Sequence, residues 1–134
     1  MPVSESRYPD DWFLIAAKDL ERVTKRLQER DVDDAAFRLQ QAIEKYLKGY
    51  LLSQGWQLKR THDVEVLLDA AVRYERGLER YRPLCRQVTG YYLVERYPTF
   101  EEGPSIGEVR KAYRRAKGLA RRIQALAGKT SKRG

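Results

Sequence analysis

Apolar residues recur at steps of three and four along most of this chain, which is the spacing that lines one face of an α-helix. No stretch of useful length alternates apolar and polar residues at period two, so no sheet is expected. The predicted helices cover residues 10–30, 34–53, 62–74, 78–95 and 106–127. Short connections favour antiparallel neighbours. The sequence therefore predicts an all-α fold, an up-and-down antiparallel bundle of about five helices.

Residues that favour helix ends support these segments. Gly55 follows the second helix, where a glycine commonly ends a helix. Thr61 or Asp63 can cap the third helix by accepting from free backbone N–H groups. Ser105 and Glu108 have the S-x-x-E spacing of a capping box, which predicts the start of the last helix.

The length and composition indicate one self-sufficient domain over residues 1–134. Apolar residues make up 42% of the chain, which is enough for a hydrophobic core that needs no structural metal ion or disulfide bond. We expect a short mobile N-terminus over 1–9 and a mobile basic tail over 128–134, because both lack apolar anchors.

A cytoplasmic, reducing setting fits the single cysteine, Cys85, which cannot form an internal disulfide. No apolar run is long enough to span a bilayer, so no membrane partner is expected. The first residues also lack the basic and apolar stretches of a signal peptide.

The positive charge is concentrated near the C-terminus. Residues 103–134 hold ten basic side chains and one acidic side chain, Glu108. We call the polar side of the last predicted helix the basic face: Arg110, Lys111, Arg114, Arg115, Lys117, Arg121 and Arg122. Such a field attracts nucleic acid, nucleotides or acidic protein surfaces. The alternative is a solvated face with no ligand.

Few residues suggest catalysis or a cofactor. His62 is the only histidine and has no cysteine nearby, so no metal site and no cofactor are expected. Its alternatives are a capping or inter-helix hydrogen bond, or a place at a ligand surface. Cys85 lies on an apolar stripe and is expected in the core. No glycine-rich phosphate loop is present.

The end of the fourth predicted helix combines aromatic and basic residues: Tyr91, Tyr92, Arg96 and Tyr97. An arginine can bind a phosphate with two hydrogen bonds, and a tyrosine ring can stack on a base. The alternative is amphipathic packing, with Arg96 complementing the helix dipole.

Residues 36–48 contain the run Q-Q-A-x-E-K-x-L-K, and Thr61-His62-Asp63 follows it in the chain. Together these segments resemble the signature helix, and the helix after it, of HEPN-domain proteins. The similarity covers about residues 10–125 and continues through three further features: Gly55, Leu67-Leu68 and Arg96-Tyr97-Pro98.

The resemblance implies a helical bundle that often dimerises. Many such proteins are partners of minimal nucleotidyltransferases, some in toxin–antitoxin pairs, and a nucleotide-binding role is proposed for the family. One branch consists of metal-independent RNases whose late helix carries an arginine followed four to six residues later by a histidine. Here no histidine follows Arg96. The departure disfavours RNase activity, since a histidine transfers protons near neutral pH.

These observations predict a non-catalytic, homodimeric protein that binds a nucleotide or pairs with a nucleotidyltransferase. A toxin-type RNase and a purely structural interaction bundle are the alternatives. The expected ligand surface contains Arg96, Tyr92 and Tyr97, with Lys45 and His62 as further contributors. The basic face is the competing site.

The dimer is expected because the aromatic residues exceed what one small core needs and favour interfaces. These residues are Trp12, Tyr46, Tyr50, Trp56, Tyr91 and Tyr92.

Overall fold

A computed structural model describes residues 5–92 and 103–133, with side chains as far as residue 128. Its helices are α1 (Pro9–Gln28), α2 (Val32–Ser53), α3 (Val64–Tyr74), η1 (Arg76–Tyr81), α4 (Arg82–Val88) and α6 (Ile106–Arg133). The described part of the chain contains no strand. The predicted all-α class and helical bundle are confirmed.

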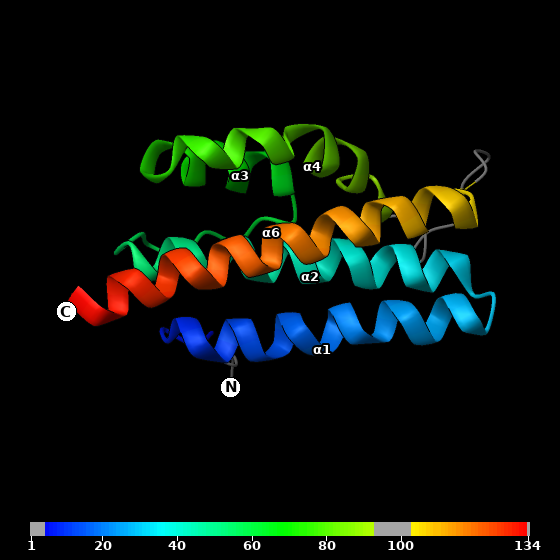
Figure 1. Cartoon of the computed structure of the whole chain (residues 1–134), viewed down its shortest axis with the longest axis horizontal. Helices are drawn as coiled ribbons and strands as arrows, with labels where there is room; N and C mark the ends of the chain where they lie inside the picture. The colour runs from blue at the N-terminus through cyan, green and yellow to red at the C-terminus, as the bar shows by residue number, and fades with distance from the viewer. Residues whose placement is uncertain (1–4, 93–102, 134) are drawn as a thin grey trace.

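Three long helices run along the molecule, and a layer of shorter helices packs on them (Figure 1). The α2 helix contacts α1, α3, α4 and α6, so it is the central element. The α1 and α2 helices are antiparallel, as the short connection between them predicts. The α6 helix runs in the same direction as α2, because α3, η1 and α4 intervene and return the chain (Figure 1).

The core follows the apolar stripe of α2. Leu39, Ile43, Leu47 and Leu51 are at most 1% exposed and recur every four residues along the helix. The stripes of the other helices close around them in a single cluster. The α1 helix comes so close that a Cβ added at Gly49 would lie 2.6 Å from the Phe13 ring. This glycine is therefore needed for the packing of α1 on α2.

The predicted helix ends are largely those observed. Asp31 accepts from the Asp34 N–H at the start of α2, and Asp63 accepts from two N–H groups at the start of α3. Gly55 has a φ of 85°, a left-handed conformation that glycine adopts without strain. Ser105 Oγ accepts from the Glu108 N–H at 3.1 Å, as the capping spacing predicts.

The fourth helix differs from the prediction of one helix over 78–95. A 3₁₀ segment, η1, precedes the short α4, and residues 93–95 lie outside the described ranges. Pro83 explains the break, since it has no N–H to donate to the carbonyl four residues earlier. The chain instead begins a new α-helix with the proline in its first turn. The α6 helix also extends to Arg133, past its predicted end.

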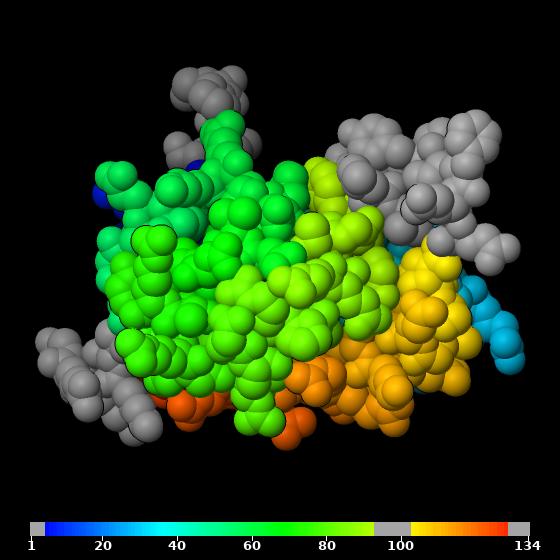
Figure 2. Space-filling model, turned by 90° about the horizontal axis from the view of Figure 1, so that it is seen from above, coloured from blue at the N-terminus to red at the C-terminus, as the bar shows by residue number. Residues whose placement is uncertain are grey.

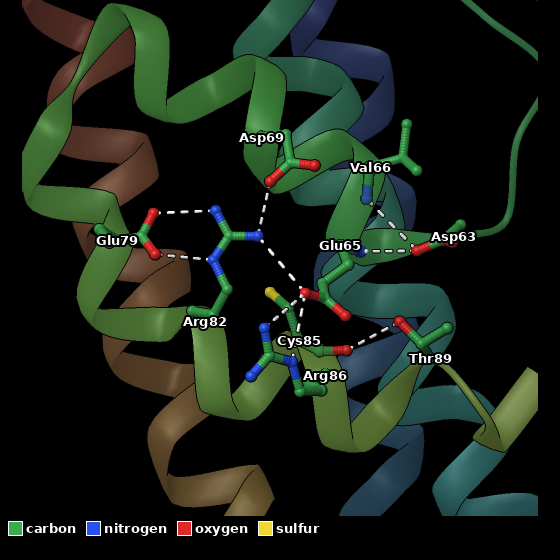
Figure 3. A network of polar contacts seen from close by, with 9 residues as sticks. All are labelled: Asp63, Glu65, Val66, Asp69, Glu79, Arg82, Cys85, Arg86 and Thr89. Carbon is green, nitrogen blue, oxygen red and sulfur yellow. Dashed lines mark hydrogen bonds and ion pairs between the residues drawn. The ribbon is translucent and has the colours of Figure 1, made fainter.

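Arg82 ties η1 and α4 to α3 (Figure 3). It donates two hydrogen bonds to Glu79, at 2.7 and 2.8 Å, and one to Asp69 at 2.6 Å. The guanidinium lowers the pKa of the Glu79 carboxyl. Glu65 accepts from Arg86 at 3.2 Å on the same surface. These contacts fix the short layer that carries the residues leading to Tyr92.

Cys85 lies in the core beside this network, as predicted. Burial raises the pKa of its thiol to about 12. At neutral pH the side chain is therefore a protonated, inert apolar group.

Candidate functional site

Much of the polar side of α2 is buried rather than exposed. The sequence favours one polar face with these members: Gln40, Gln41, Glu44, Lys45 and Lys48. Three members of this polar face, Gln40, Glu44 and Lys48, are only 0%, 3% and 3% exposed. The loop before α3 covers Gln40 and Glu44, and the Trp12 ring lies over the Lys48 ammonium at 5.5 Å. Helical spacing could not reveal this, because it does not show what packs against a polar face.

Glu44 is the centre of the buried network. Its carboxylate accepts from Gln40 Nε2 at 3.0 Å and from Lys48 Nζ at 3.1 Å. The same carboxylate lies 2.9 Å from His62 Nδ1. Gln40 Nε2 also donates to the His62 backbone oxygen at 2.9 Å. Two helix residues thus hold both the backbone and the ring of His62.

His62 forms an inter-helix hydrogen bond and is also accessible. An ionised carboxylate only accepts, so Nδ1 donates to Glu44 and Nε2 lies on the opposite side of the ring. The side chain is 54% exposed. Its ring stacks on Tyr92, with centroids 4.1 Å apart and planes 14° from parallel. The structure therefore brings together two of the predicted site residues.

A tilted ring contact extends this pair to α2. The Phe37 ring lies 6.0 Å from that of Tyr92, and the Arg38 guanidinium lies 5.6 Å from the Phe37 centroid. We call His62, Tyr92 and Phe37 the aromatic row. It has a cation at the Phe37 end.

Further cations precede His62 in the chain. Lys59 and Arg60 are exposed in the loop between α2 and α3. The sequence pattern did not single them out, nor did it single out Phe37 and Glu44. The spacing of Glu44 and Lys48, four residues apart on a helix, was the available signal for an ion pair.

Lys45 belongs to a second cluster. It donates to Asp19 of α1 at 2.6 Å, and Asp19 is 1% exposed. Arg22 and Arg38 approach the same carboxylate at 3.3 and 3.6 Å. The structure thus assigns Lys45 an ion pair that joins α1 to α2, and shows no contact between Lys45 and the described residues of the aromatic row.

Two predicted ligand residues, Arg96 and Tyr97, lie outside the described residues. The range 93–102 that contains them begins directly after Tyr92. Their predicted roles remain predictions.

The basic face occupies the solvent side of α6. All of its arginines and Lys111 are exposed, and Lys117 is half-buried. The described residues contain no group of three side chains that could hold a metal ion.

Two hollows lie between α1 and α6, away from the aromatic row. One has a volume of about 510 Å³ and includes Tyr46 and Tyr113. The other, of about 890 Å³, lies near the start of α1 and includes Tyr8, Phe13 and Leu14. Ala17 borders both, so they follow the same side of α1.

Comparison with known proteins identifies the family. The model of the HEPN domain matches residues 5–126. The chain belongs to the HEPN family. This confirms the resemblance carried by the Q-Q-A-x-E-K run and by Thr61-His62-Asp63.

Solved structures with the same fold include the following two. The crystal structure of ST0689, described as an archaeal HEPN homologue, is 21% identical with a TM-score of 0.72, covering 90% of this chain and 98% of that one. The crystal structure of TT1696 from Thermus thermophilus is 26% identical with a TM-score of 0.64, covering 91% and 97%. A search of curated proteins finds no match. Within the described residues, no helix of this HEPN domain is long and apolar enough to cross a membrane.

Proposed function

We propose that this HEPN protein is a non-catalytic nucleotide-binding protein that acts as a homodimer and uses the aromatic row as its binding surface. The observation that carries the proposal is the half-exposed His62 ring, stacked on Tyr92 and fixed by the buried Glu44.

The buried network is costly in free energy, which points to a positioning role. Removing two charges from water costs several kcal/mol per ion before their attraction compensates. Glu44 and Lys48 are both almost fully buried. An apolar pair would pack α2 equally well, but it could not orient His62. The network therefore supports a function for the histidine ring.

The chemistry of the surface matches a nucleotide. Exposed aromatic faces stack on bases, and arginines bind phosphate oxygens. The aromatic row supplies the rings, while Lys59 and Arg60, exposed in the loop that leads to His62, supply positive charge. In related proteins the functional arginine occupies the place of Arg96, so we assign it a phosphate contact.

A second candidate, a metal-independent RNase, is favoured by one observation. A histidine whose Nδ1 donates to a buried carboxylate has the arrangement of a general base, and Nε2 of His62 lies opposite that bond. In this candidate His62 replaces the histidine that does not follow Arg96.

Nucleotide titration by calorimetry tests the proposal. His62→Ala and Arg96→Ala should each weaken binding at least tenfold. Tyr74→Ala is the matched control, because Tyr74 is an aromatic residue of α3 that is 47% exposed. No nucleotide binding by the parent protein would overturn the proposal. RNA cleavage that is lost in His62→Ala would establish the RNase instead.

The homodimer needs a different argument from the one the sequence offers. Tyr46, Tyr50 and Tyr91 are 4%, 2% and 6% exposed, so they belong to the chain's own core and are not free for an interface. Exposed apolar residues occur instead near the start of α1, where Leu14 is 60% and Ile15 is 46% exposed. Leu14 borders the larger hollow.

A second copy of this chain fits that surface. A two-fold pairing would bring each Leu14 to the hollow of the partner. The first turn of α1 is acidic, with Asp10 and Asp11, and Lys25 lies in its last turn. Antiparallel pairing of two α1 helices would place opposite charges together. The nucleotidyltransferase partnership rests on the family resemblance alone.

Light scattering at tens of micromolar tests the dimer. Leu14→Glu should convert a dimer into a monomer. Val66→Glu is the control, since Val66 is 47% exposed on α3. A monomeric parent protein, or a Leu14→Glu variant that stays dimeric, would contradict this interface.

A further inference from the structure

The basic face of α6 differs from the aromatic row in having almost no partners. Arg110, Lys111, Arg114 and Arg121 make no hydrogen bond or ion pair within the described residues. Arg115 donates to the Arg80 backbone oxygen at 3.1 Å, which leaves its charge without a carboxylate. The charge of this face is therefore available to a ligand.

Neighbouring elements extend the surface. Arg115 and Arg122 reach η1 and the residue before it, since Arg122 lies 3.9 Å from Glu75. Arg76 and Arg80 of η1 are exposed. The nearby Glu79 carboxylate already accepts hydrogen bonds from Arg82, so it does not pair with these arginines. Figure 2 shows α6 along the edge of the layer formed by α3, η1 and α4. The positive surface is thus wider than one helix.

Helix geometry arranges these cations in two rows. One row contains Arg110, Arg114 and Arg121, and the other contains Lys111, Arg115 and Arg122. At about 1.5 Å per residue, each row extends about 16 Å. Small residues, Gly107, Gly118 and Ala125, lie between the rows. A helix that carries cations on both sides of an uncharged strip can contact the phosphates of both backbones when it lies along the major groove of a duplex.

The residue types favour a duplex over a single strand. Single-strand binding sites combine positive charge with exposed aromatic rings on which bases stack. The exposed residues of α6 between 107 and 128 are arginine, lysine, glycine, alanine, glutamine and one glutamate, with no aromatic residue. Arginine dominates, and its planar guanidinium binds phosphate with two hydrogen bonds. Such a surface contacts backbones and reads no bases.

We infer that the surface formed by the basic face, Arg76 and Arg80 binds double-stranded nucleic acid through its phosphates, without sequence selectivity. The inference is independent of the proposed nucleotide site, which α2, the loop before α3 and Tyr92 build. Mononucleotides offer few phosphates and should bind this surface poorly.

Fluorescence anisotropy with a duplex of about 20 base pairs and mixed sequence tests the inference, on a probe long enough to cover both rows. The parent protein should bind at low salt and lose about 10²–10³ in affinity between 50 and 200 mM salt, as expected for four or five phosphate contacts. The double variant Arg114→Ala, Arg121→Ala should bind at least tenfold more weakly, with a smaller salt dependence. Arg114→Lys, Arg121→Lys should retain part of the binding.

Two controls separate charge from position. Lys18→Gln, Arg30→Gln removes the same charge from exposed positions of α1 and of the turn that follows it, and should leave binding unchanged. His62→Ala should also leave duplex binding unchanged, while it weakens nucleotide binding. A failure of one site therefore does not imply a failure of the other.

Three results would overturn the inference. The parent protein could fail to bind the duplex at low salt, or Arg114→Ala, Arg121→Ala could bind it as the parent does. Equal or tighter binding of a single strand or of polyglutamate would instead assign the surface to another polyanion.

Discussion

The lysines of α2 and the arginines of α6 differ in burial and in pairing. Lys45 and Lys48 are paired with carboxylates at 2.6 and 3.1 Å, and Lys48 is 3% exposed. Arg110, Arg114 and Arg121 are exposed and make no ion pair within the described residues. The α2 cations join helices to one another, whereas Arg110, Arg114 and Arg121 make no such contact within the described residues.

This difference indicates where function can be sought. A paired, buried charge is already used by the protein, so its role is to position other groups, as Glu44 and Lys48 position His62. An exposed, unpaired row of like charges repels itself. Such a row costs a small amount of stability, which the binding of a polyanion would offset.

The largest expected effect comes from breaking the buried pair. Glu44→Ala leaves the Lys48 ammonium buried without its carboxylate and should lower the free energy of unfolding by about 3–5 kcal/mol. Urea denaturation measures the change. Glu21→Ala on the exposed side of α1 is the control and should change stability by less than about 0.5 kcal/mol.

The double variant Glu44→Met, Lys48→Met sharpens this result. It removes both charges and should be more stable than Glu44→Ala alone by about 2 kcal/mol or more. It should nevertheless lose nucleotide affinity, because His62 is no longer oriented. A double variant with parent-like nucleotide binding would contradict the positioning role.

Glycines of the two regions should respond with opposite signs. A Cβ at Gly49 would lie 2.6 Å from Phe13, so Gly49→Ala should destabilise the protein by about 1–3 kcal/mol through overpacking. A Cβ at Gly118 of α6 would meet only the Tyr81 hydroxyl at 3.5 Å. Gly118→Ala should therefore stabilise by about 0.5–1 kcal/mol. Thermal unfolding of the two variants provides the test. If the melting temperature shifts in the same direction in both, the expected difference between α2 and α6 is contradicted.

The sequence could predict the helices and most of their ends, because spacing and caps are local. Asp63, Gly55 and Ser105 act as their residue types suggest. The prediction of a single fourth helix from residue 78 is wrong because Pro83 lies inside that range: it cannot continue a helix that has already begun, so the α-helix begins at Arg82 and η1 precedes it.

The candidate site was predicted only in part. The sequence singled out His62 and Tyr92, and the structure stacks them. It could not show that Gln40 and Glu44 are buried, since that depends on which residues, far along the chain, cover α2. The sequence therefore identifies the residues that hold His62 only as members of a polar helix face.

Raising the pH above 9 should lower the stability of the protein through its buried core, while the arginines of the basic face stay charged. Burial raises the pKa of Cys85 from 9.0 to about 12 in the folded protein. A raised pKa contributes stability that is complete below the unfolded pKa and is lost as pH rises toward the folded one. Stability should fall by about 1.4 kcal/mol per pH unit above pH 9 from this group.

Urea denaturation between pH 8 and 10 measures that slope. Burial also raises the pKa of Tyr46, Tyr50 and Tyr91. Above the ordinary tyrosine pKa of 10.0, these three side chains therefore also lower the free energy of unfolding as pH rises. The Cys85→Ala variant should show the shallower slope. Identical slopes for the parent and the variant would show that the thiol is not responsible.

The smallest effect, and the one that most directly tests the contrast, is a gain in stability on the basic face. Arg114 has like-charged neighbours at the positions that face it on a helix: Arg110, Lys111 and Lys117. Arg114→Glu replaces these repulsions with attractions and should stabilise the protein by about 0.5–1 kcal/mol at low salt. The gain should shrink as salt screens the exposed charges. The same variant should bind the duplex at least tenfold more weakly. A stabilised protein that loses its ligand is the result expected of a surface maintained for binding, whereas a destabilised Arg114→Glu variant would show that the arginine supports the fold after all.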